Sequence, residues 1–449
     1  MPVIWWIRRD LRLNDNATLH AASQAGSVIP VFVIDPAFSN SSPRRKNFLY
    51  EGLHALDRDF RARSSYLVVR KGKPIEVLQQ LVDETKAELI YTEEDFTPYA
   101  RKRDSEVARH LPLQFVHGQT VHHPTDIRKS DGNPYIVFTP HSKAWKAKLP
   151  SLMHLYAAPE KINTPSGVSS EPIPGFKVSP LFPAGEQEAL VRLEEFLYQR
   201  IFAYNEQRDR MDLEGTSSLS PYLHFGMLGV RQAVAAARQA IAQKRSAGPE
   251  SWLNELIWRE FYIQILYHFP HVRRTAFHQA LANVAWRNDA SEFEAWKQGR
   301  TGVPIVDAAM RQLKEIGWIH NRARMIAASY LVKDLLIDWR WGEAHFMNEL
   351  LDGDIAANNG GWQWVAGTGT DAAPYFRMFN PVRQSLKFDP KGDYIRKWVH
   401  ELRELDAESI HAPWEHKIKV NGYPERPIVE RNKERTMIAY RSSKESPSV

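Results

Sequence analysis

The strongest constraint on the fold is a change of hydrophobic pattern along the chain, from alternating elements to helices alone. Over the first 130 residues, short runs of β-branched and aromatic residues alternate with stretches of helical periodicity. The runs are Val3–Ile7, Val28–Ile34, Tyr66–Val69 and Glu88–Tyr91, and the helical stretches are Ala17–Ala25, Asn47–Arg63 and Pro74–Lys86. Strands separated by helices pair in parallel through right-handed crossovers. The pattern therefore predicts an α/β domain with a parallel sheet.

A connector and a second domain follow. Residues 131–187 are rich in Pro, Ser, Gly and Lys, which is typical of a long connector on the surface. From Glu188 to about Ala407 helical periodicity returns without convincing strands, and a short polar tail, Arg441–Val449, ends the sequence. The predicted fold class is α/β plus all-α, with an α/β domain over 1–130, a linker over 131–187 and a helical domain over 188–449.

Composition narrows the function classes. The absence of cysteine excludes disulfides, thiolate metal sites and a cysteine nucleophile. No apolar run approaches the length of a membrane span, and the N-terminus lacks the basic segment of a secretory signal. We therefore expect a cytoplasmic protein without membrane contacts. A net charge of +6 suits a polyanionic partner, but it equally suits a mildly basic soluble enzyme.

The turn after the first expected strand is unusual. That strand runs into Arg8-Arg-Asp-Leu-Arg12 rather than into the glycine fingerprint of dinucleotide-binding folds. A nucleotide could still bind at the carboxyl edge of the sheet, but not through a glycine turn.

A hydroxyl-rich segment, Gly215-Thr-Ser-Ser-Leu-Ser-Pro-Tyr222, lies at an expected helix start. Unpaired backbone N–H groups and the helix dipole hold phosphate at such a position. A simple helix cap explains the same residues, and taken alone it is the favoured interpretation.

The segment Trp252-Leu-Asn-Glu-Leu-Ile-Trp-Arg-Glu-Phe-Tyr262 is more informative. Helical spacing places Glu255, Trp258, Arg259 and Tyr262 on one face. An acid, an indole, a guanidinium and a phenol form a poor hydrophobic seam but a good wall for stacking and hydrogen-bonding a flat ligand. A solvated amphipathic face is the alternative.

Two later segments add candidates. Gly317-Trp-Ile-His-Asn-Arg-Ala-Arg-Met325 places Asn321 and Met325 one turn apart, beside two arginines suited to phosphate. Leu351-Asp-Gly-Asp-Ile-Ala-Ala-Asn-Asn-Gly-Gly-Trp-Gln-Trp364 combines carboxylates, amides, paired glycines and indoles. Asp352 and Asp354 lack a third ligand nearby, so we expect no metal site.

These motifs resemble the photolyase/cryptochrome family, and the whole chain is most similar to class I cyclobutane pyrimidine dimer photolyases. The resemblance runs from Arg8-Arg-Asp-Leu-Arg12 to Pro427-Ile-Val429, and the segments 252–262 and 352–364 carry it most specifically. It implies light-dependent repair of pyrimidine dimers in UV-damaged DNA, single- or double-stranded, by electron transfer from photoexcited reduced FAD. The lesion would be flipped out of the duplex.

The resemblance also implies roles for individual residues. Those matching FAD contacts are Tyr204, Thr216, Ser217, Ser218, Leu219, Ser220, Trp252, Arg259, Asp352, Gly353, Asp354 and Asn358, the last beside the flavin N5. Those matching the lesion pocket are Glu255, Trp258, Asn321, Arg322, Met325 and Trp364, and those matching other DNA contacts are Arg208, Tyr262 and Gln384. Trp362, Trp339 and Trp286 match the tryptophan relay that reduces oxidised flavin.

Alternatives within the family are weaker. Photolyases for (6-4) photoproducts place histidines where this chain has Asn321 and Met325, and many signalling cryptochromes append a long tail that this sequence lacks. A light-sensing role without catalysis is the rival function.

We expect a monomer with a second, light-harvesting chromophore. Ala100 stands where folate-binding relatives place an acidic residue, which favours a deazaflavin-like chromophore over folate, with a flavin or an empty site left open.

Overall fold

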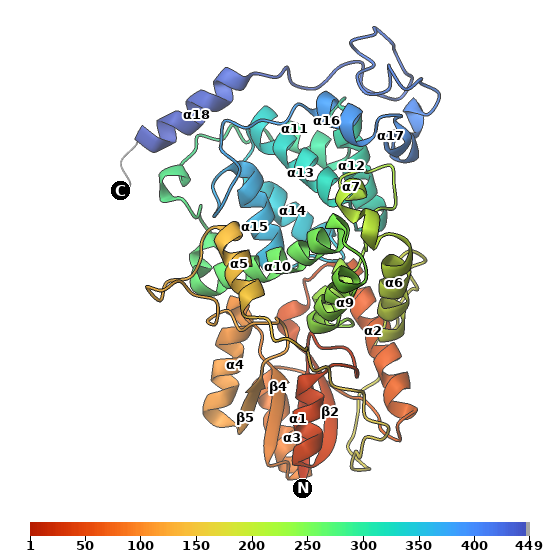
Figure 1. The fold of residues 1–449 in the computed structure, drawn as a ribbon, viewed down its shortest axis with the longest axis vertical. Coiled ribbons are helices and arrows are strands. Elements are labelled where there is room, and N and C mark those ends of the chain that lie inside the picture. Colours follow the sequence, from red (N-terminus) through yellow and green to blue (C-terminus); the bar gives the residue numbers. More distant parts are fainter. Residues whose placement is uncertain (446–449) are drawn as a thin grey trace. The chain divides into compact units, whose positions relative to one another are not determined.

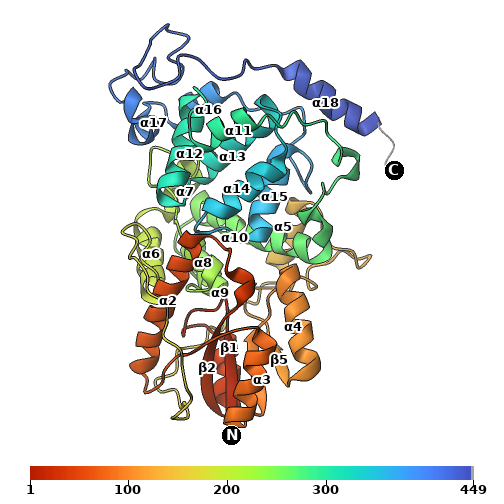
Figure 2. The same cartoon turned by 180° about the vertical axis from the view of Figure 1, so that it is seen from behind.

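The predicted parallel sheet is present, and its strands follow the order β3-β2-β1-β4-β5. The structure is a computed structural model that describes residues 1–445. Its strands are β1 (Pro2–Ile7), β2 (Ser27–Ile34), β3 (Val68–Lys71), β4 (Leu89–Glu93) and β5 (Leu113–Val116). β1 is central and almost wholly buried, because helices cover both faces of a parallel sheet. Both views show β5 near α4 at one side of the sheet and β2 towards the other (Figures 1 and 2).

The chain divides into two compact units. Unit 1 contains Met1–Phe202 and Ser217–His268, and unit 2 contains Ala203–Thr216 and the chain from Phe269 onward. The helices α6, α8, α9 and α10 thus group with the sheet. The domain boundaries at residues 130 and 187 rest on sequence pattern and stay a prediction.

Unit 1 surrounds its sheet with helices. These are α1 (Ala17–Ala25), α2 (Pro43–Arg61), α3 (Pro74–Thr85), α4 (Pro98–His110), α5 (Phe138–Ala147), α6 (Glu186–Gln199), α8 (Ser220–Phe225), α9 (Val230–Gln243) and α10 (Ala247–His268), with the 3-10 turns η1 (Pro36–Phe38) and η2 (Ile201–Ala203). α10 packs against α9 and α5.

Unit 2 is helical, as predicted. Its elements are α7 (Tyr204–Gln207), η3 (Pro270–Arg273), η4 (Gln279–Leu281), α11 (Ala290–Lys297), α12 (Pro304–Ile316), α13 (Asn321–Ser329), the π-helical turn η5 (Tyr330–Asp334), α14 (Trp339–Glu349), α15 (Ile355–Ala366), α16 (Pro381–Phe388), α17 (Asp393–Trp398), η6 (His400–Leu402) and α18 (Lys433–Glu445). α14 and α15 lie side by side in both views (Figures 1 and 2). Its core gathers fully buried residues such as Leu331, Trp296 and Trp339.

Four elements correct the sequence-based picture. The expected linker contains the helix α5, neither the helix α4 nor the strand β5 was predicted, and most of the expected polar tail is the last turn of α18. Residues 446–449 of that tail lie outside the described residues. β5 is a four-residue edge strand with two exposed side chains, so its hydrophobic pattern is weak. Within residues 1–445, no helix is long and apolar enough to cross a membrane.

Candidate functional site

The stripe predicted on residues 252–262 is present on α10. Glu255, Trp258, Arg259 and Tyr262 are all partly buried, while Leu256, Ile257 and Phe261 between them are buried. The 22-residue helix thus has one less buried face, and that face carries the acid, the indole, the guanidinium and the phenol. Trp252, on the same helix, is buried in the protein core and packs on Phe196 with ring centroids 5.0 Å apart.

The indole of Trp258 is stacked within unit 1. The ring of Phe138, at the start of α5, lies parallel to it, with centroids 3.7 Å apart and an interplanar angle of 4°. Tyr262, one turn along α10, lies 5.4 Å from the indole at 35°. The contact with Phe138 could not be predicted from the sequence, because it joins α10 to a helix that was not predicted.

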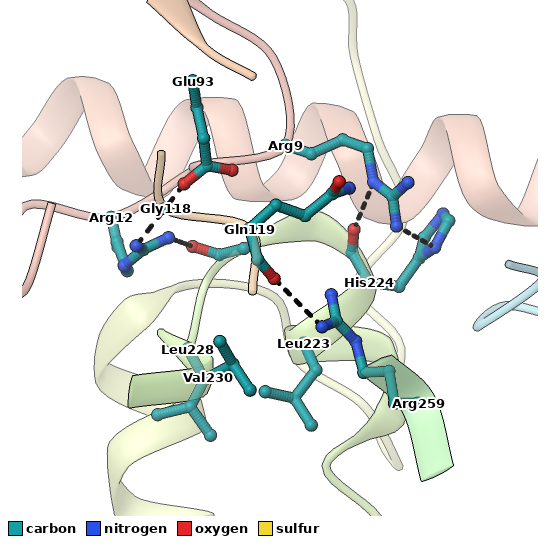
Figure 3. Close-up of a pocket in the computed structure, with 11 residues that line it drawn as sticks. Arg9, Arg12, Glu93, Gly118, Gln119, Leu223, His224, Leu228, Val230 and Arg259 are labelled. Atoms are coloured by element: carbon teal, nitrogen blue, oxygen red, sulfur yellow. Dashed lines mark hydrogen bonds and ion pairs between the residues drawn. The ribbon is translucent and has the colours of Figure 1, made fainter. Parts of the chain in front are cut away.

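Arg259 borders a small polar cavity (Figure 3). One terminal nitrogen of its guanidinium donates to the carbonyl of Gln119 at 3.0 Å, and Arg9 donates from Nε to the carbonyl of His224 at 2.9 Å. Across the cavity, Glu93 lies 3.7 Å from Arg12, and burial raises the pKa of Glu93 to about 8. The cavity has a volume of about 10 Å³, which is the size of one water molecule and far too small for a nucleotide.

Glu260, the neighbour of Arg259, is a buried acid on α10. Its carboxylate accepts hydrogen bonds from Trp145 Nε1 at 2.7 Å and from the backbone N–H of Val121 at 2.6 Å. It is 4% exposed, and burial raises its pKa to about 7. Glu260 therefore anchors α5 and the loop after β5, a structural role that the sequence did not reveal.

The hydroxyl-rich segment spans the boundary of the two units. Thr216 ends its part of unit 2, and Ser217 begins the second part of unit 1. Ser218 has a positive φ of 51°, and α8 begins at Ser220, so a helix does start in this segment as predicted. Leu219 is buried and Tyr204, at the start of α7, is 7% exposed.

In unit 2, α13 presents the polar residues predicted from the segment 317–325. His320 caps the helix through Nδ1, which accepts the N–H of Arg322 at 3.1 Å. Asn321 is exposed and its amide contacts the sulfur of Met325 at 3.7 Å, one turn away. The guanidinium of Arg322 forms an ion pair with Asp209 at 2.8 Å.

Asp352 and Asp354 both lie just before the start of α15. Asp354 caps the helix by accepting the N–H groups of Ala356 and Ala357. Asp352 is 7% exposed and pairs with Arg324 at 2.7 Å through Oδ2, while its Oδ1 is buried without a hydrogen-bond partner. In residues 1–445, no three His, Asp or Glu side chains are placed to hold a metal ion.

The amides of α15 divide into two groups. Asn358 is partly buried and donates from Nδ2 to the carbonyl of Glu343 at 3.0 Å. Asn359 and Gln363 both donate to the carbonyl of Val272, at 3.1 and 2.8 Å. Asn359 and Gln363 thus bond the backbone at Val272, in another segment of the same chain, rather than a ligand. Residue type alone could not distinguish these two amides from Asn358.

The three tryptophans of the predicted relay share one hydrophobic region. Trp339 and Trp362 are 1% and 3% exposed and belong to one core cluster, against which the partly exposed Trp286 packs. Gly342 on α14 leaves room for the indole of Trp362, since a Cβ at that position would clash with its ring.

The remaining candidates of unit 2 lie on α7, α15 and α16 or in the turns beside these helices. The guanidinium of Arg208 lies 5.6 Å from the ring centroid of Tyr204. Gln384 on α16 is partly buried with an unpaired Oε1, and Trp364 is partly buried on α15. Gly353 is buried in the turn before α15.

Comparison with known proteins identifies the family. The profile described as "DNA photolyase" matches residues 3–163, and that described as "FAD binding domain of DNA photolyase" matches residues 252–444. The deoxyribodipyrimidine photo-lyase of Synechococcus sp. is 40% identical, over 96% of this chain and 94% of its own.

Solved structures agree. The class III photolyase of Agrobacterium tumefaciens has a TM-score of 0.94 at 34% identity, covering 99% of this chain and 98% of its own. A photolyase of Sulfolobus tokodaii with two FAD molecules has a TM-score of 0.85 at 33% identity (99% and 100% covered), and a Synechocystis cryptochrome 0.88 at 30% (98% and 99%). The chain therefore belongs to the DNA photolyase family, and its cofactor is FAD.

Proposed function

We propose that this protein repairs cyclobutane pyrimidine dimers in UV-damaged DNA with the energy of light. The observation that carries the proposal is its similarity, over nearly the full length of both chains, to a deoxyribodipyrimidine photo-lyase. The stripe on α10 and the polar face of α13 each supply residue types suited to contacting a flipped pyrimidine dimer.

The residues around α15 fit a bound FAD. The buried Oδ1 of Asp352 is an acceptor without a hydrogen-bond partner, which suits a polar group of a bound ligand. Separately, a Cβ at Gly361 on α15 would meet nothing within 4 Å, so this glycine leaves space beside the helix. When bound and reduced, FAD supplies the excited electron that splits the dimer.

Asn358 is the residue proposed to lie beside the flavin. Its Nδ2 is engaged by the carbonyl of Glu343, so the amide plane is fixed and Oδ1 is directed away from that bond. A fixed neutral oxygen can accept a hydrogen bond from a protonated ring nitrogen without adding a charge. The other proposed FAD-binding residues are Tyr204, Thr216, Ser217, Ser218, Leu219, Ser220, Trp252, Arg259, Gly353 and Asp354.

On α10, Glu255 and Trp258 are proposed as one wall of the lesion site. The carboxylate accepts hydrogen bonds from the base edges, and the indole stacks on the dimer. Stacking of one base on an aromatic side chain contributes about 1–3 kcal/mol. In unit 2, Asn321, Arg322, Met325 and Trp364 are proposed lesion contacts, and Arg208 and Gln384 join Tyr262 as DNA contacts.

The tryptophans Trp286, Trp339 and Trp362 are proposed to carry an electron from the surface towards oxidised flavin. Their graded exposure supports this order, since Trp286 is partly exposed and the other two are buried. The relay serves activation only, and repair by an enzyme that is already reduced does not need it.

A second chromophore is proposed at the carboxyl edge of the sheet, where ligands of open α/β sheets bind. There Tyr99 donates to Asp35 at 2.6 Å, and Phe38 meets Tyr99 edge to face at 5.3 Å. Ala100 is 2% exposed and offers no polar group to a folate, so a deazaflavin-like chromophore is favoured, and the second FAD of the Sulfolobus tokodaii photolyase makes a flavin the alternative. Extracted chromophores identified by mass test this assignment.

We further propose that the protein acts as a cytoplasmic monomer. The experiment that tests the function uses two irradiated oligonucleotides, one with a cyclobutane thymine dimer and one with a (6-4) photoproduct. We expect the purified protein to restore only the dimer, in light and not in darkness. Repair of the (6-4) lesion alone would contradict the proposed substrate, and repair of neither would favour a light-sensing role like that of a cryptochrome.

A further inference from the structure

The helix α5 is attached to α10 by specific contacts within unit 1. Trp145, near its end, donates to the buried carboxylate of Glu260 at 2.7 Å. In the middle of the helix, Ser142 donates to the side-chain oxygen of Asn254 at 3.4 Å. These contacts fix the position of the first residue of α5, Phe138.

Phe138 covers one face of Trp258. The two rings are parallel with centroids 3.7 Å apart, so they overlap almost completely. Phe261 stands perpendicular to both, 5.5 Å from the indole and 5.9 Å from Phe138. Because Phe261 is almost equally distant from the two stacked rings, it flanks the edge of the stack. Tyr262, with its centroid 5.4 Å from the indole and tilted by 35°, is too far and too inclined to stack on the second indole face.

We infer that Phe138 is a positioning residue that holds the indole of Trp258 for stacking against a flipped pyrimidine dimer. This inference rests on the proposed role of Trp258 in the lesion site. While the stack persists, a planar ligand can meet the indole only on the face opposite Phe138, and the plane of that face is set by Phe138.

The physical reason is preorganisation. A tryptophan that is only partly buried pays rotamer entropy when a ligand immobilises it, and a ring already held in the bound orientation avoids that cost. Parallel overlap restrains the indole plane more than an aliphatic neighbour of similar volume would, because only a flat ring matches its whole surface. Phe138 is itself half-buried, so it is backed by the protein and not loosely placed.

The test compares Phe138→Leu, which keeps bulk but loses the flat face, with Phe138→Tyr, which keeps the ring. The measurements are dissociation constants of the FAD-loaded full-length protein for dimer-containing and undamaged DNA. We expect Phe138→Leu to weaken dimer binding about 2- to 10-fold, the equivalent of one aromatic pair. Phe138→Tyr should bind like the parent, and so should Thr139→Ala, a change at an exposed residue of the same helix. If Phe138→Leu does not fold, Phe138→Met replaces it.

A double-mutant cycle with Trp258→Ala shows whether Phe138 acts through the indole. We expect Phe138→Leu to have no further effect on dimer binding once the indole is absent. An equal loss in both backgrounds, or an equal loss for undamaged DNA, would overturn the inference. If Trp258→Ala leaves the preference for dimers unchanged, it is the proposed lesion wall that fails. If Trp258→Ala removes the preference and Phe138→Leu does not reduce it, only the positioning role is wrong.

Discussion

Asn358 on α15 donates a hydrogen bond of 3.0 Å from its side-chain amide to the backbone carbonyl of Glu343 on α14. The bond joins two helices that pack side by side, and it leaves the amide oxygen as the group that can face a ligand. The pair therefore fixes one neutral acceptor at the position that we assign to the flavin ring.

Replacing Asn358 should separate binding of FAD from repair. Asn358→Ala removes the acceptor but leaves the other proposed FAD contacts in place, so FAD content and dimer binding should be retained. Losing one hydrogen bond to a charged ring costs about 1.5–3 kcal/mol. When the supply of reductant is limiting, the rate of repair should therefore fall roughly 10- to 100-fold. Quantified FAD release and the rate of dimer loss in light check this. Unchanged repair by a fully loaded variant would place Asn358 outside the flavin site.

Arg208 is proposed to contact a DNA phosphate. Arg208→Gln should lower the slope of log affinity against log salt by about one unit, because one fewer counterion is released on binding. The matched control is Arg61→Gln on α2, whose side chain is 67% exposed and paired with Asp57; it should leave the slope unchanged. Equal slopes for Arg208→Gln and the parent would mean that Arg208 contacts no phosphate. Arg322 is already paired with Asp209, so its own slope effect depends on exchanging that partner.

His320 should make the start of α13 sensitive to acid. Burial lowers its pKa to about 4; Asp209 opposes this shift, while Arg322, Arg324 and Arg208 reinforce it. The unfolded chain, with the pKa near 6.5, binds the proton first as pH falls, so stability is lost between about pH 6.5 and 4. Protonation would also remove the Nδ1 acceptor that caps α13 by bonding the backbone N–H of Arg322.

The stability contribution of His320 is measured by urea unfolding at pH 7.5 and pH 5. Because other buried histidines titrate as well, the relevant quantity is the difference between the parent and His320→Asn, which keeps an N-cap acceptor. The parent should lose about 2 kcal/mol more than this variant. The same pH dependence in both proteins would show that His320 is not responsible.

Trp286 should matter for photoreduction and not for repair. Trp286→Phe keeps an aromatic ring in a partly exposed position, so stability should change little. Under blue light with an external reductant, the variant should fail to photoreduce its FAD. After chemical reduction with dithionite, it should repair dimers at close to the parent rate.

The control for Trp286 is Trp341→Phe, since Trp341 is also surface-accessible, at 36% exposure, but lies outside the proposed relay. It should photoreduce normally. Normal photoreduction by Trp286→Phe would point to another terminal donor, and inactivity after chemical reduction would show that Trp286 is structural.

Much of the fold could be predicted because local pattern and tertiary packing agree in it. The strands β1 and β2 are runs of β-branched and aromatic residues, and such runs are buried wherever they occur in a parallel sheet. The stripe on α10 followed from spacing alone, because helical geometry fixes which side chains share a face.

The parts that were missed depend on contacts between distant segments. α5 contains a proline and little periodicity, and it is held to α10 by Trp145 bonding to Glu260. The stack of Phe138 on Trp258 requires that docking, so nothing in either segment signals it. Likewise, Asn358 and Asn359 are adjacent and chemically identical, and only the turn of α15 separates the candidate flavin contact from the structural amide.

We propose that the protein repairs pyrimidine dimers with light, and that the electron given to the dimer returns to the cofactor once the dimer is split. The most direct test is the number of dimers split per FAD in light by enzyme that was reduced beforehand and freed of reductant, under anaerobic conditions. We expect many dimers split per FAD in light and none in darkness, because a cycle that returns the electron has no net redox change. A yield limited to one dimer per FAD, or equal splitting in the dark, would contradict it.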